Sequence, residues 1–132
     1  MLDFLFDDLG VGVDIERIDR FESDKITNSI SFLSRVFTKN ELTYCFSSQV
    51  PAQHLAARFA GKEAVFKALS RFGGKKLAFR EIQIINDETG IPNVVIQRED
   101  YENINIIISL SHSKDLVIAF AVARRLGIEI KN

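Results

Sequence analysis

Two acidic residues near the N-terminus have the spacing of ligands for a divalent cation. Asp14 and Glu16 stand two positions apart in the segment Gly12-Val13-Asp14-Ile15-Glu16. Residues two apart in a β-strand point to the same face of the sheet, and carboxylates that share a face near a strand end suit a hard cation. Two exposed acids on an edge strand give the same pattern, so the spacing alone does not decide between these interpretations.

A second candidate group lies farther along the chain, where charged residues repeat at helical spacing. Arg58 and Lys62 are four positions apart, as are Glu63 and Lys67, so each pair shares a face of a helix. Gly61 stands in the middle of this segment at a cost of about 1 kcal/mol relative to alanine. Such a glycine indicates that another element approaches the backbone closely. Two ordinary surface pairs would show the same spacing.

The charge around this segment is uneven. Residues 58–80 contain seven basic side chains and one acid, Glu63, and so carry +6, whereas the whole chain carries −1. A basic cluster that holds a single carboxylate favours a phosphorylated ligand with a metal ion nearby. A solvated helix face followed by a basic turn is the alternative.

The third candidate group is Ser111-His112-Ser113, which follows an apolar run. Its hydroxyl and imidazole groups can donate hydrogen bonds to a phosphate. A Ser–His nucleophile pair is less favoured, because adjacent residues on a strand point to opposite faces and no Gly-x-Ser-x-Gly elbow is present. The chain has only two histidines, His54 and His112, which disfavours a metal site built on histidine.

The first half of the chain predicts one strand followed by helices. Alternation predicts a strand over residues 9–18 with two distinct faces. One face has Val11, Val13 and Ile15, and the other has Gly12, Asp14 and Glu16. Helices are predicted over residues 18–23, 29–37, 39–46 and 52–72, the last beginning after Pro51. Thr38 and Glu41 have the Thr-x-x-Glu spacing of a capping box.

The second half of the chain predicts strands. They cover residues 77–85, 92–97, 103–109 and 117–122, with turns at 87–90 and 113–115. We therefore predict a single α+β domain over residues 1–132, in which a small antiparallel sheet packs against one long helix plus short helices.

Composition excludes several classes of protein. The chain has 132 residues, of which 46% are hydrophobic and 27% charged, so bulk disorder is excluded. The near-neutral charge gives no reason to expect nucleic acid as a partner. A single cysteine, Cys45, excludes an internal disulfide and a cysteine-rich metal site. No transmembrane or secretory segment is apparent, so we expect a cytoplasmic protein that is not bound to a membrane.

Taken together and in this order, the motifs resemble those of the 4′-phosphopantetheinyl transferase superfamily, and within it the short holo-acyl-carrier-protein synthase class. The resemblance extends from about residue 10 to residue 122. It is carried by Gly12-Val13-Asp14-Ile15, Phe37-Thr38 with Glu41-Leu42, Ala57-Arg58-Phe59-Ala60-Gly61-Lys62-Glu63-Ala64 with Lys67-Ala68, Asn86-Asp87 with Gly90 and Pro92, and Ser109-Leu110-Ser111-His112-Ser113.

The resemblance implies an enzyme of fatty acid biosynthesis. Such an enzyme transfers the 4′-phosphopantetheine group of coenzyme A to a serine of an apo acyl carrier protein and releases adenosine 3′,5′-bisphosphate. Asp14 and Glu63 match the ligands of Mg²⁺ and, with Lys67, the catalytic positions. The positions around the phosphates of coenzyme A are matched by Arg58, Lys62, Lys67, Ser111 and His112.

Two further features concern the metal and the carrier. Arg20 falls on the basic patch that the short class uses to grip an acidic helix of the carrier, and Arg17 is placed there with it. Glu16 departs from the short class, because an Asp-x-Glu pattern is usual in the larger two-lobed transferases, where it adds a third carboxylate. The acids Asp19, Glu22 and Asp24 also weaken the expected basic face.

The resemblance also implies a homotrimer with sites at the subunit junctions, because the short class corresponds to one lobe of the two-lobed enzymes. Residues 104–109 and 117–122 place apolar side chains on both faces of their strands, which agrees with one face being covered by neighbouring copies. Arg58 and His112 are then expected to act across the interface from Asp14 and Glu63. A monomer whose short helices cover the second face is the alternative.

Two other classes of function fit some of the same residues. A metal-dependent phosphohydrolase would use the same acids and bases on a free nucleotide. A non-catalytic module would bind an acidic helical partner through Arg17, Arg20 and the basic segment.

Overall fold

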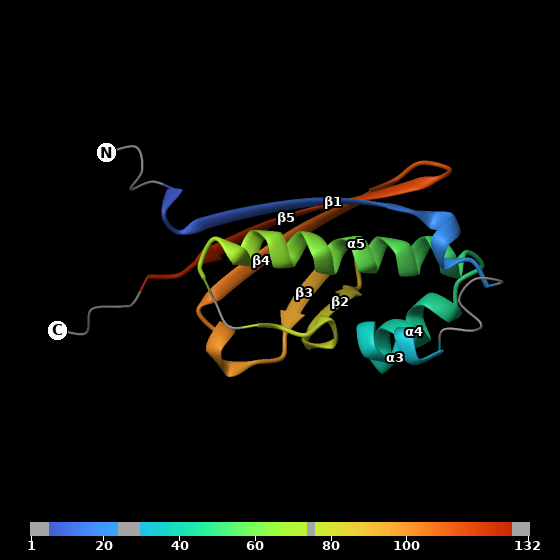
Figure 1. The fold of residues 1–132 in the computed structure, drawn as a ribbon, viewed down its shortest axis with the longest axis horizontal. Helices are drawn as coiled ribbons and strands as arrows, with labels where there is room; N and C mark the ends of the chain where they lie inside the picture. The colour runs from blue at the N-terminus through green and yellow to red at the C-terminus, as the bar shows by residue number, and fades with distance from the viewer. Residues whose placement is uncertain (1–5, 24–29, 74–75, 128–132) are drawn as a thin grey trace.

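Helix α5 (Pro51–Ser70) runs through the middle of the molecule between two layers of other elements (Figure 1). The computed structural model describes residues 6–23, 30–73 and 76–127. Pro51 occupies the first turn of α5, where its missing N–H group needs no helical partner. Eleven of the twenty residues of α5 are buried, so this helix is the centre of the core.

One layer is a three-stranded antiparallel sheet with the strand order β1-β5-β4. Its strands are β1 (Leu9–Arg17), β4 (Ile104–His112) and β5 (Leu116–Arg125). The register pairs Glu16 of β1 with Val117 of β5, and Val117 with His112 of β4. The two edge strands therefore carry Glu16 and His112 at the same end of the sheet.

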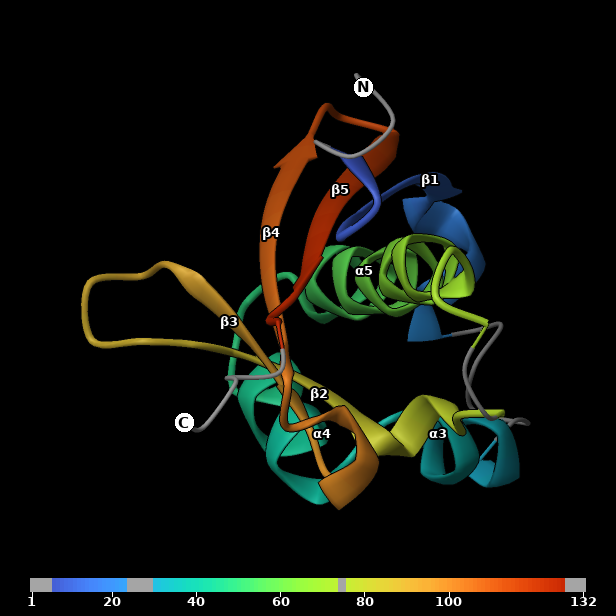
Figure 2. The same cartoon turned by 90° about the vertical axis from the view of Figure 1, so that its left-hand side faces the viewer.

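The other layer lies on the opposite side of α5 (Figure 2). It contains the antiparallel hairpin β2 (Ile82–Asn86) and β3 (Pro92–Ile96) with helices α3 (Ile30–Val36) and α4 (Lys39–Phe46). Three short 3-10 segments complete the described elements: η1 (Ile18–Phe21), η2 (Phe79–Glu81) and η3 (Glu99–Tyr101).

Glycines let β1 lie directly against α5. A Cβ atom on Gly12 would stand 1.9 Å from the carbonyl oxygen of Ala64, and one on Gly10 would stand 1.9 Å from that of Ala68. No side chain fits in so small a gap. The two elements therefore meet backbone to backbone, which brings the side chains of β1 and α5 within reach of each other farther along.

The predicted α+β architecture is confirmed, with two differences in detail. Residues 77–81 are not strand, because η2 forms there and β2 begins only at Ile82. The Ala78 N–H donates to the Glu81 carboxylate, a local cap that competes with strand pairing. The strands also form two sheets rather than one. Position 29 of the predicted helix over 29–37 lies outside the described residues.

The capping box at the start of α4 is confirmed. The Glu41 N–H donates to the Thr38 hydroxyl, and the Thr38 N–H donates to the Glu41 carboxylate. The turn between β2 and β3 is confirmed as well, with Gly90 at φ +88° and the Asp87 carboxylate accepting the N–H groups of Thr89 and Ile91.

The outer face of the three-stranded sheet is apolar and open. Val11 of β1 is 63% exposed, Phe120 of β5 is 45% exposed and Ile107 of β4 is 70% exposed. The inner face holds the buried residues of β5 against α5. The expectation that these strands carry apolar side chains on both faces is therefore confirmed. Helices α3 and α4 lie beyond α5 and do not cover the outer face (Figure 2).

Candidate functional site

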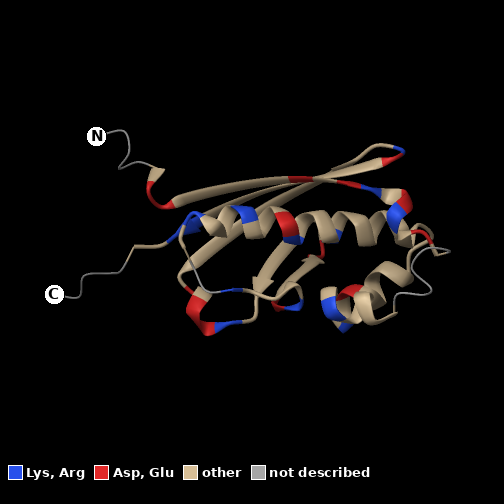
Figure 3. Ribbon diagram, viewed as in Figure 1, with Lys and Arg blue, Asp and Glu red and all other residues tan. Residues whose placement is uncertain are grey.

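Strand β1 and helix α5 bring three carboxylates together. Asp14 and Glu16 are half-buried on the face of β1 that meets the helix, as their spacing predicted. Burial raises the pKa of the Glu63 carboxyl above its ordinary value, and the nearby charges of Asp14 and Glu16 raise it further. The acidic segments of β1 and α5 lie side by side in Figure 3. We call Asp14, Glu16 and Glu63 the acidic cluster.

Two cations accompany the acidic cluster. The Lys67 ammonium lies 3.1 Å from Asp14 Oδ1 and donates to the carbonyl oxygen of Val13 at 2.9 Å. Arg20 Nη1 lies 3.0 Å from Glu16 Oε2. Both cationic side chains are about half exposed, so they can also reach a ligand outside the subunit core. Lys67 and Arg20 both lower the pKa of Glu63, but burial and the neighbouring acids outweigh them.

The acidic cluster fits a divalent cation that receives its other ligands from elsewhere. Within residues 6–23, 30–73 and 76–127, no three His, Cys, Asp or Glu side chains are placed to hold an ion by themselves. Mg²⁺ is commonly bound by one or two carboxylates together with substrate phosphates and water. The raised pKa of Glu63 agrees with such a site, because a cation would relieve the repulsion among these acids.

His112 lies at the opposite edge of the sheet from Asp14. Strand β5 separates β4 from β1, so their backbones are about 10 Å apart. Burial lowers the pKa of His54, and the charges of Arg58 and His112 lower it further. The register puts Ser111 on the outer face and His112 on the inner face. One subunit therefore does not direct Ser111 and His112 at the same ligand.

Arg58 is buried, contrary to the expectation that it faces a ligand. Its Nε donates to the carbonyl oxygen of Ile84 at 3.1 Å, and its guanidinium carbon lies 4.3 Å from the ring centroid of Tyr44. A further hydrogen bond of 3.4 Å joins Nη2 to Asn86 Oδ1. These contacts give Arg58 a role in holding β2 against α5.

Lys62 differs most from its predicted place. Its ammonium is fully buried, lies 2.8 Å from Glu41 Oε1, and donates to the carbonyl oxygens of Phe79 and Ile82. In the subunit, Lys62 therefore faces the core rather than a phosphate. Sequence reasoning treated Glu41 only as a helix cap, because no local pattern shows that its carboxylate also meets a lysine on another helix.

The arginines predicted to bind the carrier are both paired with acids. Arg17 forms an ion pair with Asp19, and this neighbour raises the pKa of Arg17. Arg20 pairs with Glu16 and lies over the ring of Phe59, with its guanidinium carbon 5.0 Å from the centroid. A partner that approached this surface would have to share or replace those acids.

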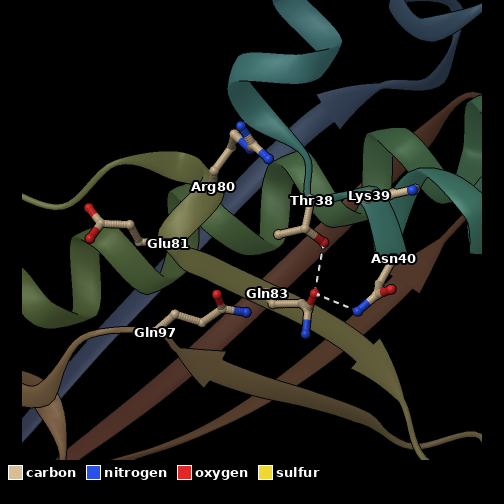
Figure 4. Close-up of a pocket in the computed structure, with 7 residues that line it drawn as sticks. All are labelled: Thr38, Lys39, Asn40, Arg80, Glu81, Gln83 and Gln97. Atoms are coloured by element: carbon tan, nitrogen blue, oxygen red, sulfur yellow. Dashed lines mark hydrogen bonds between the residues drawn. The ribbon is translucent and has the colours of Figure 1, made fainter.

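A separate polar pocket of about 420 Å³ opens beside the start of α4 (Figure 4). It is lined by Thr38, Lys39, Asn40, Arg80, Glu81, Gln83 and Gln97. The Thr38 hydroxyl donates to Gln83 Oε1 at 2.8 Å across its floor. None of the residues predicted to act on a substrate lines this pocket, so the candidate site remains at the acidic cluster.

Comparison with known proteins shows the family. The model of the 4′-phosphopantetheinyl transferase superfamily matches residues 10–121, and the chain belongs to that superfamily. In the part of the chain that the structure describes, no helix has the length and apolar character to cross a bilayer.

Similar relatives and solved structures indicate a narrower class within this superfamily, the holo-acyl-carrier-protein synthases. The chain is 41% identical over 117 residues to a holo-acyl-carrier-protein synthase of Protochlamydia amoebophila, an alignment that covers 86% of this chain and 96% of the relative. It is 43% identical over 113 residues to the enzyme of that name from Thermodesulfovibrio yellowstonii, with 86% and 96% covered. The structure of the synthase from Neisseria meningitidis has a TM-score of 0.75 at 31% identity, covering 88% of this chain and 98% of that one. The Helicobacter pylori synthase in complex with coenzyme A has a TM-score of 0.73 at 33% identity, with 86% and 98% covered.

Proposed function

We propose that this chain has holo-acyl-carrier-protein synthase activity, with Mg²⁺ held by Asp14 and Glu63. The reaction moves the 4′-phosphopantetheine group of coenzyme A onto a serine of an apo acyl carrier protein. The observation that supports the site is the ion pair of 3.1 Å between Asp14 of β1 and Lys67 of α5, with the half-buried Glu63 one helical turn before Lys67. The raised pKa of Glu63, caused by burial and by the charge of Asp14, agrees with this arrangement. Family membership supplies the reaction.

The bond changes of this reaction are simple. The serine oxygen of the carrier forms a bond to the β-phosphorus of coenzyme A, and the bond from that phosphorus to the bridging diphosphate oxygen breaks. Adenosine 3′,5′-bisphosphate leaves, and the serine proton is lost to solvent or a base. Mg²⁺, when bound, neutralises the diphosphate and polarises the group being transferred.

The chain contributes ligands and countercharge. Asp14 and Glu63 present carboxylate oxygens from two rigid elements, which fixes where the cation is held. Lys67 is poised to exchange its contact with Asp14 for a diphosphate oxygen and so to balance the charge of the leaving group. Glu16 is paired with Arg20 and orients that side chain, and it would have to leave this pair to act as a third ligand.

The active form that we propose is a homotrimer with sites between subunits. The open apolar face of the sheet supports this assembly, because exposed patches of this kind mark interfaces. Asp14 and His112 lie at opposite edges of the sheet, so a neighbouring copy is needed to bring a His112 to the acidic cluster. On this view, His112 belongs to the wall that each subunit contributes to the site of the next, whereas Ser111 lies on the other face of β4.

The cellular role that we propose is modification of the carrier of fatty acid biosynthesis in the cytoplasm. The pathway and the cytoplasmic location are both inferred from the class of enzyme. The carrier's acidic helix would meet Arg20 beside the acidic cluster, with Arg17 at the margin of the same surface.

A direct assay tests the proposed function. The purified chain is incubated with coenzyme A, Mg²⁺ and an apo acyl carrier protein, and the intact carrier is weighed by mass spectrometry. We expect the mass of one phosphopantetheine group to be added, and we expect the Asp14→Ala variant to be at least 100-fold slower while remaining folded. Hydrolysis of coenzyme A without any gain in carrier mass would instead support a phosphohydrolase. Carrier binding without turnover would support a non-catalytic module.

A further inference from the structure

A buried ion pair joins three elements on the side of α5 that faces away from the acidic cluster. The Glu41 carboxylate and the Lys62 ammonium are 2.8 Å apart, and neither side chain is exposed to solvent. Glu41 also accepts the N–H groups of Thr38 and Ile84, each at 2.8 Å. Lys62 donates to the carbonyl oxygen of Phe79 at 2.9 Å and to that of Ile82. Each partner is therefore hydrogen-bonded on several sides, and the pair ties α4 and β2 to α5.

Stability alone does not explain such a pair. Removing two charges from water costs about as much as their mutual attraction returns, and apolar replacements of buried pairs are often neutral or stabilising. What a buried, fully hydrogen-bonded pair does supply is a single geometry. The pair therefore fixes how α4, β2 and α5 lie relative to one another.

On the opposite side, α5 meets β1 through Gly10, Gly12, Ala64 and Ala68. These small residues fix how closely the two elements approach, because no side chain fits between them. None of the four has a polar side chain that would define the rotation of the helix about its axis. Repulsion between Glu63 and the acids of β1 acts across the same contact. The contact of Lys67 with the Val13 carbonyl oxygen lies at a half-exposed position, where a phosphate would compete for it.

We propose that the Glu41–Lys62 pair is a positioning device that sets the rotation and axial position of α5, so that Glu63 meets Asp14. Glu63 directly follows Lys62 in the helix. A side chain that ends about 5 Å from a helix axis moves by about 2 Å when the helix turns by about 20°. Displacements of that size in a catalytic group cost about 100-fold in rate. Neither Glu41 nor Lys62 touches the substrate in this role, and the inference rests on the proposed function.

The test distinguishes an effect on the position of Glu63 from an effect on the stability of the fold. A double variant, Glu41→Gln with Lys62→Met, removes both charges and leaves neither partner as an unpaired buried ion. We expect it to fold, with Tm within about 5 °C of the wild type and the KM for the carrier within about twofold. We expect binding of Mn²⁺ to the protein without coenzyme A, followed by electron paramagnetic resonance of free Mn²⁺, to weaken at least tenfold. We also expect kcat to fall at least tenfold.

A surface ion pair provides the matched control. Arg98 and Asp100 are 2.8 Å apart in a partly exposed pair, in which Arg98 also contacts Glu81 and the carbonyl oxygen of Lys76. Neither residue belongs to α5, so Arg98→Met with Asp100→Asn should leave Mn²⁺ binding and kcat unchanged. If the Glu41–Lys62 double variant does not fold, Lys62→Arg provides a second test. Arginine keeps the positive charge but is larger than lysine, so we expect the same losses of Mn²⁺ binding and of kcat.

A folded variant of either kind with wild-type Mn²⁺ binding and wild-type kcat would overturn the inference. That outcome is distinct from failure of the proposed function. In the latter case, the unmodified chain itself would not transfer phosphopantetheine to the carrier.

Discussion

Glu63 carries the electrostatic strain of the candidate site. Its carboxyl is half-buried beside Asp14 and Glu16, and these surroundings hold its pKa above the ordinary value. Between the ordinary and the raised pKa, the folded state binds more protons than the unfolded state. Stability of the metal-free protein therefore decreases as pH rises through that window.

The first prediction concerns this residue. Glu63→Gln should raise the Tm of the metal-free protein at pH 7 to 8, because the unfavourable buried charge is gone, and the gain should shrink as the pH falls from the raised pKa toward 4.5, the ordinary pKa of glutamic acid. Mg²⁺ should raise the Tm of the wild type but not of the variant. Calorimetry as a function of pH checks both effects. Glu102→Gln, at an exposed position, is the control, and an equal response in both variants would contradict the assignment.

A second prediction concerns the docking of the carrier at Arg20. Arg20→Ala should raise the KM for the carrier about tenfold and leave the KM for coenzyme A within about twofold. The difference between variant and wild type in the KM for the carrier should become smaller as the salt concentration rises, because exposed charges act mainly on the rate at which the carrier and the enzyme encounter each other. Alanine is preferable to glutamate, since a new acid beside Glu16 would disturb the acidic cluster itself. Arg35→Ala on α3 is the control, and equal changes in both KM values would argue against docking at Arg20.

At the scale of elements, the contact between β1 and α5 decides whether the site forms. Asp14 lies on β1 two residues after Gly12, and Glu63 precedes Ala64, whose carbonyl oxygen faces that glycine. The same close approach that excludes a side chain at Gly12 therefore brings the two carboxylates together.

The third prediction follows from this contact. Gly12→Ala should destabilise the protein by about 3 kcal/mol or more, because the new methyl group meets backbone that has no room to move. Thermal unfolding should show a Tm lower by about 10 °C. Gly127→Ala is the matched control, since a Cβ there would meet nothing within 4 Å. A Gly12→Ala protein as stable as Gly127→Ala would mean that the close contact is not needed.

At the scale of the whole molecule, one face of the three-stranded sheet is apolar and uncovered in the single chain. Its inner face packs on α5, and its outer face leaves Val11, Ile107 and Phe120 open. Exposure of such a surface to water is unfavourable, and the proposed trimer would bury it.

The fourth prediction tests assembly and the shared site together. Light scattering should give three times the chain mass for the wild type, and Phe120→Asp should lower the mass to that of one chain and abolish transfer. Ile91→Asp should change neither, because Ile91 is an exposed apolar residue on the β2–β3 turn rather than on the sheet face. Mixing inactive Asp14→Ala chains with inactive His112→Ala chains should restore part of the activity. An active monomer, or no restoration despite proven subunit exchange, would contradict the shared site.

Local patterns in the sequence were sufficient for much of the fold. The capping box of Thr38 and Glu41, the helix after Pro51, the turn at Gly90 and the common face of Asp14 and Glu16 depend on residues close together in the chain. Such features follow from spacing and backbone preference, so they can be inferred without tertiary structure. The order of the motifs along the chain likewise sufficed to indicate the family.

Only the tertiary structure decided which charged residues lie at the surface beside the acidic cluster and which face the core. Lys62 and Lys67 are both lysines on one helix, but Lys62 meets Glu41 and two carbonyl oxygens inside the protein, whereas Lys67 reaches Asp14 at the surface. Their difference depends on α4 and β2, elements far away in sequence, whose packing no helical spacing encodes. For the same reason, the separation of Asp14 from His112 became visible only once β5 was seen to lie between β1 and β4.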